Sequence, residues 1–201
     1  MSPGDPLDAD RLRAAAGHQH IGREIVVLQQ ATSTNDAIAE MAARTAEGLV
    51  VFAEEQTAGR GQYGRRWESA AGKGLWLSIL LRPRLSVGDS ARLTAFLAAA
   101  IAATIQEQLG VSATIKPPND VYVDERKVAG VLVEMRVEAP GSYCAIAGLG
   151  INVNHAPEDF PGELSGRAGS LAQATGQRID RSAFAVALLR KLDEDYAAAE
   201  L

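Results

Sequence analysis

The segment from Ser112 to Asn154 constrains the fold more than any other, because its strand-forming stretches follow one another with only turns between them. The stretch "SATIK" runs into the turn "PPND", and "VYVDERKVAGVLVEM" predicts a hairpin with its tip at "DER". The returning strand of that hairpin is expected over Val128 to Met135, and "SYCAIAGLGINVN" predicts another strand. Adjacent hairpins, rather than alternating strands and helices, indicate a sheet whose strands are mainly antiparallel.

The rest of the chain predicts further strands and several helices. Strands are expected in "IVVL" at 25–28, in "LVVFAE" at 49–54 and in "GLWLSILLRP" up to Pro83, where apolar side chains alternate. Helices are expected at 8–16, in "TSTNDAIAEMAAR", from Asp89 or Ser90 to Leu109, near 169–175 and at 181–199. The predicted fold class is therefore α+β, a mixed and mainly antiparallel sheet with helices packed on one face.

Composition limits the classes of function. The 201 residues suffice for one substantial domain, and the net charge of -5 argues against broad nucleic-acid binding. The opening residues "MSPGDPLDADRLR" are polar and do not resemble a signal peptide. The apolar run from Leu93 to Ile105 is shorter than the roughly 18 residues that a membrane span needs. We therefore expect a cytoplasmic protein with no nucleic-acid or membrane partner.

The cysteine and the histidines do not indicate a metal site. Cys144 is the only cysteine and lies in an apolar run, so a buried side chain is expected there. The three histidines, His18, His20 and His155, have no metal-ligand spacing with carboxylates or with Cys144. No metal-binding residue is therefore expected.

The stretch from Gly59 to Trp67, "GRGQYGRRW", places arginines among glycines directly after a hydrophobic run. Glycine lets a backbone approach a ligand closely, and the guanidinium group binds oxyanions with a fixed fork of donors. The alternative is a solvated run of charge, but so many glycines are costly in a loop that is merely solvated. The stretch therefore predicts a loop that binds phosphate groups.

Five stretches together resemble the catalytic core of biotin protein ligases. They are "STN" at 33–35, "GRGQYGRRW" at 59–67, "KPPND" at 116–120, "KVAGVLVE" at 127–134 and "GLGINVN" at 148–154. They stand in the order of that family and close to its spacing, and the resemblance covers about residues 25–195. One motif alone would be weak evidence for the resemblance, whereas five motifs in register are specific to the family. The resemblance implies the catalytic-core fold of biotin and lipoate ligases, which is like that of class II aminoacyl-tRNA synthetases.

The resemblance also implies an activity, that of an ATP-dependent biotin-[biotin carboxyl-carrier protein] ligase. In that family MgATP activates biotin to biotinyl-5'-AMP, and a lysine of a biotin carboxyl carrier domain then takes the biotin. ATP, Mg²⁺ and biotin are the small molecules implied, and the carrier domain is the implied partner. Gly59, Gly61 and Gly64 suit a loop that closes over the activated intermediate.

Site residues are implied wherever the sequence matches the motifs of the family. The residues implied for catalysis are Lys127, Arg60 and Arg65. Those implied for biotin are Ser33, Thr34, Asn35, Gln56, Gly59, Arg60, Lys127, Gly130 and Leu132. Those implied for ATP and the adenylate are Arg60, Gln62, Arg65, Trp67, Asn119, Lys127 and Asn152, with Asp120 orienting its neighbours.

Each of these assignments has a plainer alternative. The "STN" corner is also typical of a helix cap, "PND" of an ordinary turn, and Trp67 and Trp76 of core aromatic residues. Lys127 taken alone would be an exposed surface lysine. Only its register with "AGVL" favours a position beside the biotin carboxylate and the α-phosphate.

Two positions depart from the pattern of the family. Gln62 stands where several members carry another arginine, so we expect weaker retention of the adenylate and some transfer of biotin to other lysines. Pro117 stands where tryptophan is usual, in "KWPND", so we expect the turn to be repacked.

The two ends of the sequence set the expected domain organisation. Residues 1–24 are expected to form an N-terminal extension, too short for a DNA-binding domain, and residues 25–201 the ligase catalytic domain. Family members usually continue into a small C-terminal β domain, but "KLDEDYAAAEL" predicts a helix. We therefore expect no C-terminal β domain and no repressor role. An exposed edge strand could pair with a second copy, so a homodimer is one expected assembly.

Two other functions stay open at the level of sequence. A lipoate or octanoyl ligase of the same superfamily would share the fold, but it would need an apolar tunnel in place of polar partners at Ser33, Thr34 and Gln56. A biotin-binding protein without catalysis would fit the departures at Gln62 and Pro117. The cationic residues argue against it, because a pure binder has no polyphosphate to neutralise.

Overall fold

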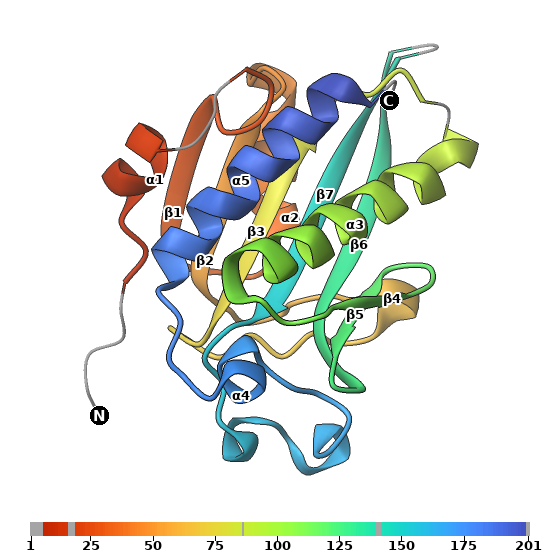
Figure 1. The fold of residues 1–201 in the computed structure, drawn as a ribbon. Helices are drawn as coiled ribbons and strands as arrows, with labels where there is room; N and C mark the ends of the chain where they lie inside the picture. The colour runs from red at the N-terminus through yellow and green to blue at the C-terminus, as the bar shows by residue number, and fades with distance from the viewer. Residues whose placement is uncertain (1–5, 16–18, 86, 140–141, 200–201) are drawn as a thin grey trace.

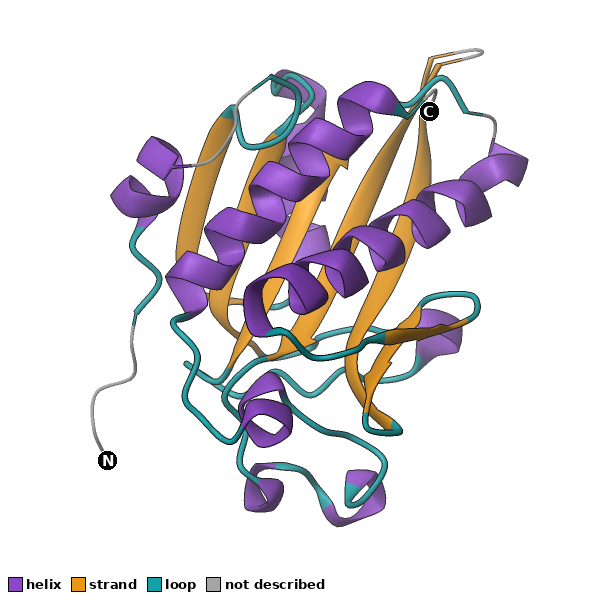
Figure 2. Ribbon diagram, viewed as in Figure 1, coloured by secondary structure: helices purple, strands orange, loops and turns teal. Residues whose placement is uncertain are grey.

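The computed structural model describes residues 6–15, 19–85, 87–139 and 142–199, which build one seven-stranded sheet flanked by helices (Figures 1 and 2). The strand order is β1-β2-β3-β7-β6-β5-β4. The strands are β1 (Glu24–Ala31), β2 (Leu49–Gln56), β3 (Gly74–Leu81), β4 (Thr114–Lys116), β5 (Asp120–Val123), β6 (Arg126–Ala139) and β7 (Ser142–Asn152). The helices are α1 (Ala9–Ala15), α2 (Thr34–Met41), α3 (Ser90–Leu109), α4 (Leu171–Thr175) and α5 (Arg181–Ala198).

The pairing of the strands confirms the predicted mixed, mainly antiparallel sheet. Within the described sheet, β1 and β2 run parallel and the other neighbouring pairs run antiparallel. The parallel pair arises because α2 crosses over between β1 and β2, whereas β5, β6 and β7 follow one another through turns. β6 continues to Ala139, beyond the predicted end at Met135. Its last four residues are exposed, although Val137 and Ala139 continue the alternation of the strand.

Helices cover both faces of the sheet. The two long helices, α3 and α5, lie side by side on one face, as predicted (Figure 1). α2 lies on the opposite face and so differs from the expectation of helices on a single face (Figure 1). Its Ile38 packs in a second apolar cluster with Val51 and Ile146 of the sheet. β3 is buried on both sides for this reason, with Leu77 in the cluster under α3 and α5 and Leu80 in the cluster under α2.

The longest apolar run of the sequence forms part of α3. Leu93, Leu97, Ile101 and Ile105 recur every four residues and are buried in the main core. Gly110 ends the helix in the left-handed conformation at a φ of 68°, which glycine adopts without strain. Across the described ranges of the chain, no helix has both the length and the apolar character to cross a membrane.

The described residues before β1 pack on the same core as the rest of the chain. Leu7 and Ile21 are buried in the main apolar cluster, and α1 contacts both β1 and α5. The carboxylate of Asp193 in α5 accepts hydrogen bonds from the backbone N–H groups of Gln19, His20 and Ile21, at 2.9, 2.6 and 2.7 Å. The described part of the expected N-terminal extension is therefore integrated into the domain.

Candidate functional site

A cavity of about 590 Å³ is lined by the start of α2, the end of β2, the loop of residues 59–67 (the Gly/Arg loop) and facing parts of β6 and β7. The cavity brings together every implied site residue except Gly59: Ser33, Thr34, Asn35, Gln56, Arg60, Gln62, Arg65, Trp67, Asn119, Lys127, Gly130, Leu132 and Asn152. Asp120 lines it as well. Gly59 lies next to the cavity, where the backbone of Trp67 approaches it closely. A Cβ atom at Gly59 would come within 2.6 Å of the Trp67 carbonyl oxygen.

One wall of the cavity is a network of polar side chains. Ser33 caps α2 by accepting a hydrogen bond from the N–H of Asn35, as the cap pattern predicted. The N–H and the hydroxyl of Thr34 both donate to Oε1 of Gln56, at 2.8 and 3.2 Å. Nε2 of Gln56 donates to Ser69 at 2.9 Å. The "STN" corner is thus both a helix cap and a preorganised part of the cavity wall.

Ser78 completes this network, although the sequence did not single it out. It lies in the middle of β3 and is fully buried, with its hydroxyl oxygen 2.7 Å from Oγ1 of Thr34 and 2.5 Å from Oδ1 of Asn35. Nδ2 of Asn35 in turn donates to Glu134 of β6 at 2.8 Å. The signal that could have revealed Ser78 is a lone hydroxyl in the apolar strand "GLWLSILL", because a buried hydroxyl needs a partner.

The indole of Trp67 lies over two glycines on neighbouring strands. A Cβ atom at Gly130 or Gly150 would come within 2.9 or 2.5 Å of the ring, so the ring fits only because both residues are glycine. Trp76 stands edge-on to Trp67, with 6.4 Å between ring centroids, and is fully buried. Of the two tryptophans, Trp76 is therefore a core residue, whereas Trp67 lines the cavity. Nε1 of Trp67 is buried, and among the described residues it has no hydrogen-bond partner.

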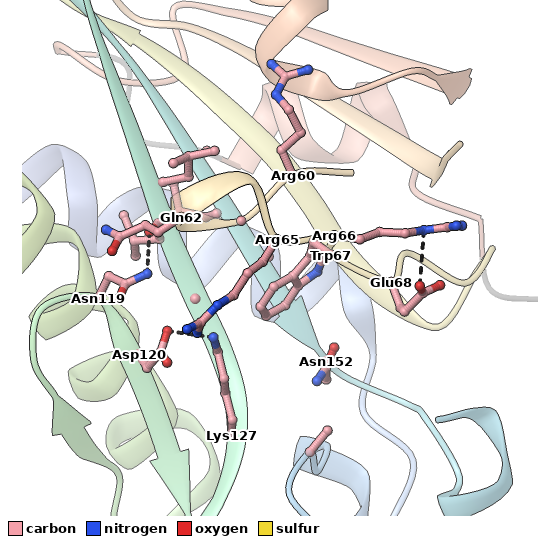
Figure 3. A pocket seen from close by; sticks show the side chains of 18 of the residues that line it. Arg60, Gln62, Arg65, Arg66, Trp67, Glu68, Asn119, Asp120, Lys127 and Asn152 are labelled. Atoms are coloured by element: carbon pink, nitrogen blue, oxygen red, sulfur yellow. Dashed lines mark hydrogen bonds and ion pairs between the residues drawn. The ribbon is translucent and has the colours of Figure 1, made fainter. Parts of the chain in front are cut away.

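Lys127 lies near the start of β6, just past the tip of the hairpin, as predicted. The tip is a tight turn at Asp124 and Glu125, whose φ angles are positive at 48° and 61°. The Lys127 ammonium group lies 2.6 Å from Oδ1 of Asp120. The side chain of Arg65 points to the same place (Figure 3). Two cationic groups and one carboxylate therefore meet at this side of the cavity.

The segment of residues 160–169 holds the backbone of Lys127 from outside the sheet. The N–H of Lys127 donates to the Arg167 carbonyl at 2.9 Å, and the N–H of Gly169 donates to the Lys127 carbonyl at 2.9 Å. Phe160 and Arg167 also line the cavity. Sequence reasoning missed these residues because this stretch has no regular period and matches no motif.

Arg60 lines the same cavity, but its guanidinium group points away from Lys127 and Arg65 (Figure 3). It forms a bidentate ion pair with Asp36 of α2, at 2.8 and 2.7 Å, and lies 3.6 Å from Glu134. The hydrogen bonds from Arg60 lower the pKa of Asp36, and those to Asp36 raise the pKa of Arg60. The resemblance implied a phosphate ligand at Arg60, and the structure places two carboxylates against it, neither of which the sequence had singled out.

Residues 27–152 match the family model described as the biotin/lipoate A/B protein ligase family. The chain belongs to this family. The bifunctional ligase/repressor BirA of Bacillus subtilis is 38% identical over 88% of this chain and 54% of that protein. The biotin-[acetyl-CoA-carboxylase] ligase of Mycobacterium tuberculosis is 33% identical, over 94% of this chain and 70% of that protein. The chain thus spans about half the length of its BirA relatives, 54% for the one from Bacillus subtilis.

Solved structures of the biotin/lipoate ligase family share the fold. The biotin protein ligase from Aquifex aeolicus, in complex with biotin and ATP, has a TM-score of 0.77 and 32% identity, covering 87% of this chain and 71% of that one. A putative lipoate protein ligase from T. acidophilum with bound lipoic acid has a TM-score of 0.62 at 14% identity, which shows a common fold alone. The same fold is thus found with biotin in one structure and with lipoic acid in the other, so the fold alone assigns no ligand.

Both departures from the biotin ligase pattern lie on the cavity. Gln62 belongs to a short 3-10 turn, Gln62–Gly64, within the Gly/Arg loop. Pro117 lines the cavity next to Pro118. The turn that follows is fixed to β6, because Nδ2 of Asn119 donates to the Val131 carbonyl at 2.9 Å and the Val131 N–H donates to the Asn119 carbonyl at 3.0 Å. One side-chain and one backbone hydrogen bond to β6 thus hold this turn where the usual tryptophan is replaced.

His155 has the environment of a core residue. It is buried and stacks on Phe160, with 5.1 Å between ring centroids. Burial lowers the pKa of His155 to about 4. No group of three or more histidine, cysteine or acidic side chains is placed to hold a metal ion anywhere in the described part of the chain.

We expect Gly150→Ala to displace the Trp67 indole, because the added methyl group would overlap the ring. Overpacking of this kind should lower the free energy of unfolding by about 1–3 kcal/mol and shift tryptophan emission to longer wavelength. Urea unfolding and emission spectra check both effects. The matched control is Gly162→Ala, where an added Cβ would meet no atom within 4 Å. Equal behaviour of the two variants would contradict the packing of the indole on Gly150.

We expect His155 to contribute a pH-dependent part of stability. Its pKa is about 4 in the folded protein and roughly 6.5 unfolded, so between these values only the unfolded chain binds the proton. Stability is therefore complete above pH 6.5 and falls towards pH 4, by on the order of 2–3 kcal/mol. In His155→Phe the free energy of unfolding should lose this part of its dependence on pH. Urea unfolding at several pH values measures that dependence. Parallel curves for the two proteins would show that folding does not change the pKa of His155.

Proposed function

We propose that the chain is an ATP-dependent biotin ligase, which activates biotin with MgATP to biotinyl-5'-AMP and transfers the biotin to a lysine of a biotin carboxyl carrier domain. The observation that carries the proposal is that a preorganised polar network and a cationic pair, Arg65 and Lys127, line one cavity. Family membership and the names of the relatives support it. So does the similarity to a ligase that was solved in complex with biotin and ATP.

The polar network suits the ring of biotin. The ureido group of that ring is uncharged and offers both N–H donors and a carbonyl acceptor. Beyond the bonds of the network, the Ser33 hydroxyl and the second N–H of Gln56 can donate and the Thr34 hydroxyl oxygen can accept, so they can match both. Buried polar groups of this kind reject an acid that would leave them unpaired, because an unpaired buried group costs free energy. The network therefore favours biotin over the apolar ring and chain of lipoate.

The cationic pair suits the first chemical step, which brings a carboxylate onto a polyphosphate. A carboxylate oxygen of biotin attacks the α-phosphorus of ATP, and the bond from that phosphorus to the bridging oxygen breaks, so pyrophosphate leaves with the bonding electrons. Lys127 and Arg65 would offset the negative charge that gathers there. Asp120 holds the Lys127 ammonium in position before the anions arrive. In this arrangement Gln62, Trp67, Asn119 and Asn152 line the nucleotide end of the cavity.

The second step transfers the biotinyl group to the carrier. The neutral amine of the carrier lysine attacks the acyl carbon, the bond from that carbon to the phosphate oxygen breaks, and AMP leaves while the amine releases its proton. Mg²⁺ would enter bound to ATP, where it would offset phosphate charge. The proposal also places the protein in the cytoplasm. It includes a homodimer in which two copies pair through an edge strand.

Lys127→Ala should lower the rate of biotin-dependent ATP-pyrophosphate exchange by at least about a hundredfold, because it removes a charge-stabilising donor at the reacting atoms. The wild type should exchange. Lys191→Ala is the matched control, since Lys191 pairs with Asp195 on α5 outside the cavity. A Lys127→Ala variant that exchanges like the wild type would remove Lys127 from the chemistry, and a wild type that binds biotin without exchange would be a binding protein only.

Biotin, and not lipoate, should support pyrophosphate exchange and should compete for the site. The physical reason is the polar wall at Ser33, Thr34 and Gln56, whose remaining donors and acceptors an apolar acyl chain would leave unpaired. Exchange measured with each acid alone, and with biotin in the presence of excess lipoate, separates the two cases. Faster exchange with lipoate would assign the chain to the other branch of the family.

A further inference from the structure

We infer that Arg60 is a positioning residue: its ion pair with Asp36 ties the Gly/Arg loop to α2 and so sets where Arg65 and Trp67 stand. The ion pair itself does not depend on which reaction the protein catalyses. Its consequence for catalysis rests on the proposed ligase function. The role differs from that of a phosphate ligand, which the sequence resemblance implied for Arg60.

The first support is the geometry of the ion pair. Each terminal nitrogen of Arg60 donates to a different carboxylate oxygen of Asp36, at 2.8 and 2.7 Å. Such parallel, charge-assisted hydrogen bonds fix orientation as well as distance. The two side chains are only about one third exposed, at 36% and 37%, so solvent screens the pair less than a fully exposed one. The guanidinium group is therefore held towards α2, on the side away from Lys127 (Figure 3).

The second support is that the Gly/Arg loop is itself a small hairpin. The N–H of Gly61 donates to the Arg65 carbonyl at 2.7 Å, and the N–H of Trp67 donates to the Gly59 carbonyl at 2.9 Å. These two bonds join the strand that carries Arg60 to the strand that carries Arg65 and Trp67. A tie on one strand of the hairpin therefore restrains the other. The hairpin has two anchors, Arg60 on α2 and the Trp67 indole on the paired glycines.

The third support is the balance of charge. Two carboxylates lie within 4 Å of the Arg60 guanidinium, so a phosphate that approached it would meet two like charges. At Lys127 the balance is reversed, because two cationic side chains, Lys127 and Arg65, point to the place where one carboxylate, that of Asp120, pairs with Lys127. Among the described residues Arg65 has no ion-pair partner. Phosphate is therefore favoured at Arg65 and Lys127, and Arg60 stabilises the loop that carries Arg65.

The tie is also continuous with the polar wall of the cavity. Glu134, the second carboxylate beside Arg60, accepts a hydrogen bond from Asn35 at 2.8 Å, and Asn35 accepts one from Ser78 at 2.5 Å. The residue that positions the loop and the residues that line the acid-binding end thus belong to one network. Loss of the Asp36 carboxylate should loosen the loop first, because Asn35 keeps its contacts with Ser78 and Glu134.

A double-mutant cycle with Asp36→Asn, Arg60→Gln and the double variant tests the inference. The first measurement is the rate at which trypsin cuts after Arg65 and Arg66 in the ligand-free protein, with fragments identified by mass spectrometry. The second is the KM for ATP and the kcat in biotin-dependent pyrophosphate exchange. Glu107→Gln is the matched control, since it removes a carboxylate from α3 that is more than half exposed, at 55%.

Each single variant should be cut about five- to tenfold faster than the wild type and should show a similar rise in the KM for ATP, with little change in kcat. The double variant should match the single variants, because both substitutions break the same tie. The control should behave like the wild type.

Two results would overturn the inference. One is an Asp36→Asn variant with unchanged cutting and unchanged KM. The other is an Arg60→Gln variant that loses far more exchange than Asp36→Asn, which would make Arg60 a direct ligand of the nucleotide. A wild type without exchange would instead refute the proposed function, and the cutting rates would still decide whether the tie exists.

Discussion

The site depends on one constraint, which is that a buried hydroxyl group must find partners. Ser78 stands in the interior strand β3, where its neighbours on both faces are apolar and fully buried. Its hydrogen bonds with Thr34 and Asn35 fix how the first turn of α2 sits on the sheet. From that turn the network continues to Gln56 at the end of β2 and to Glu134 on β6. A single buried oxygen thus sets the relative positions of three elements that line the cavity.

The second condition is space on the sheet surface. Helices cover both of its faces, so a cavity can form only where side chains are missing or turn away. Gly130 and Gly150, on the paired strands β6 and β7, leave that room, and the Trp67 indole occupies part of it. The Gly/Arg loop is thereby seated on the sheet at one end and tied to α2 at the other. Arg65 and Lys127 can then carry positive charge at the cavity, because neither side chain is buried as an isolated charge.

Much of the fold was predictable because its signals are local. The period of α3 and its end at Gly110, the cap at Ser33 and the hairpin leading to Lys127 all follow from neighbouring residues. The side of the sheet that α2 covers was not predictable, because its short apolar stripe fits either face until the crossover from β1 to β2 is built. Where the motifs matched, the residues gathered at one cavity. Arg167 and Gly169 carried no local signal, since they act through their backbone groups.

The sequence by itself determined the family, the order of strands and helices, and the motif residues that, apart from Gly59, meet at the cavity. Only the tertiary structure decided that Arg60 turns to Asp36, that Ser78 joins the polar wall and that the segment of residues 160–169 holds Lys127. The physical reason is the separation along the sequence between the residues that interact. Helix caps, turns and apolar periods depend on residues a few positions apart, whereas partners such as Asn35 and Glu134 are 99 positions apart and meet only when α2 packs across the sheet.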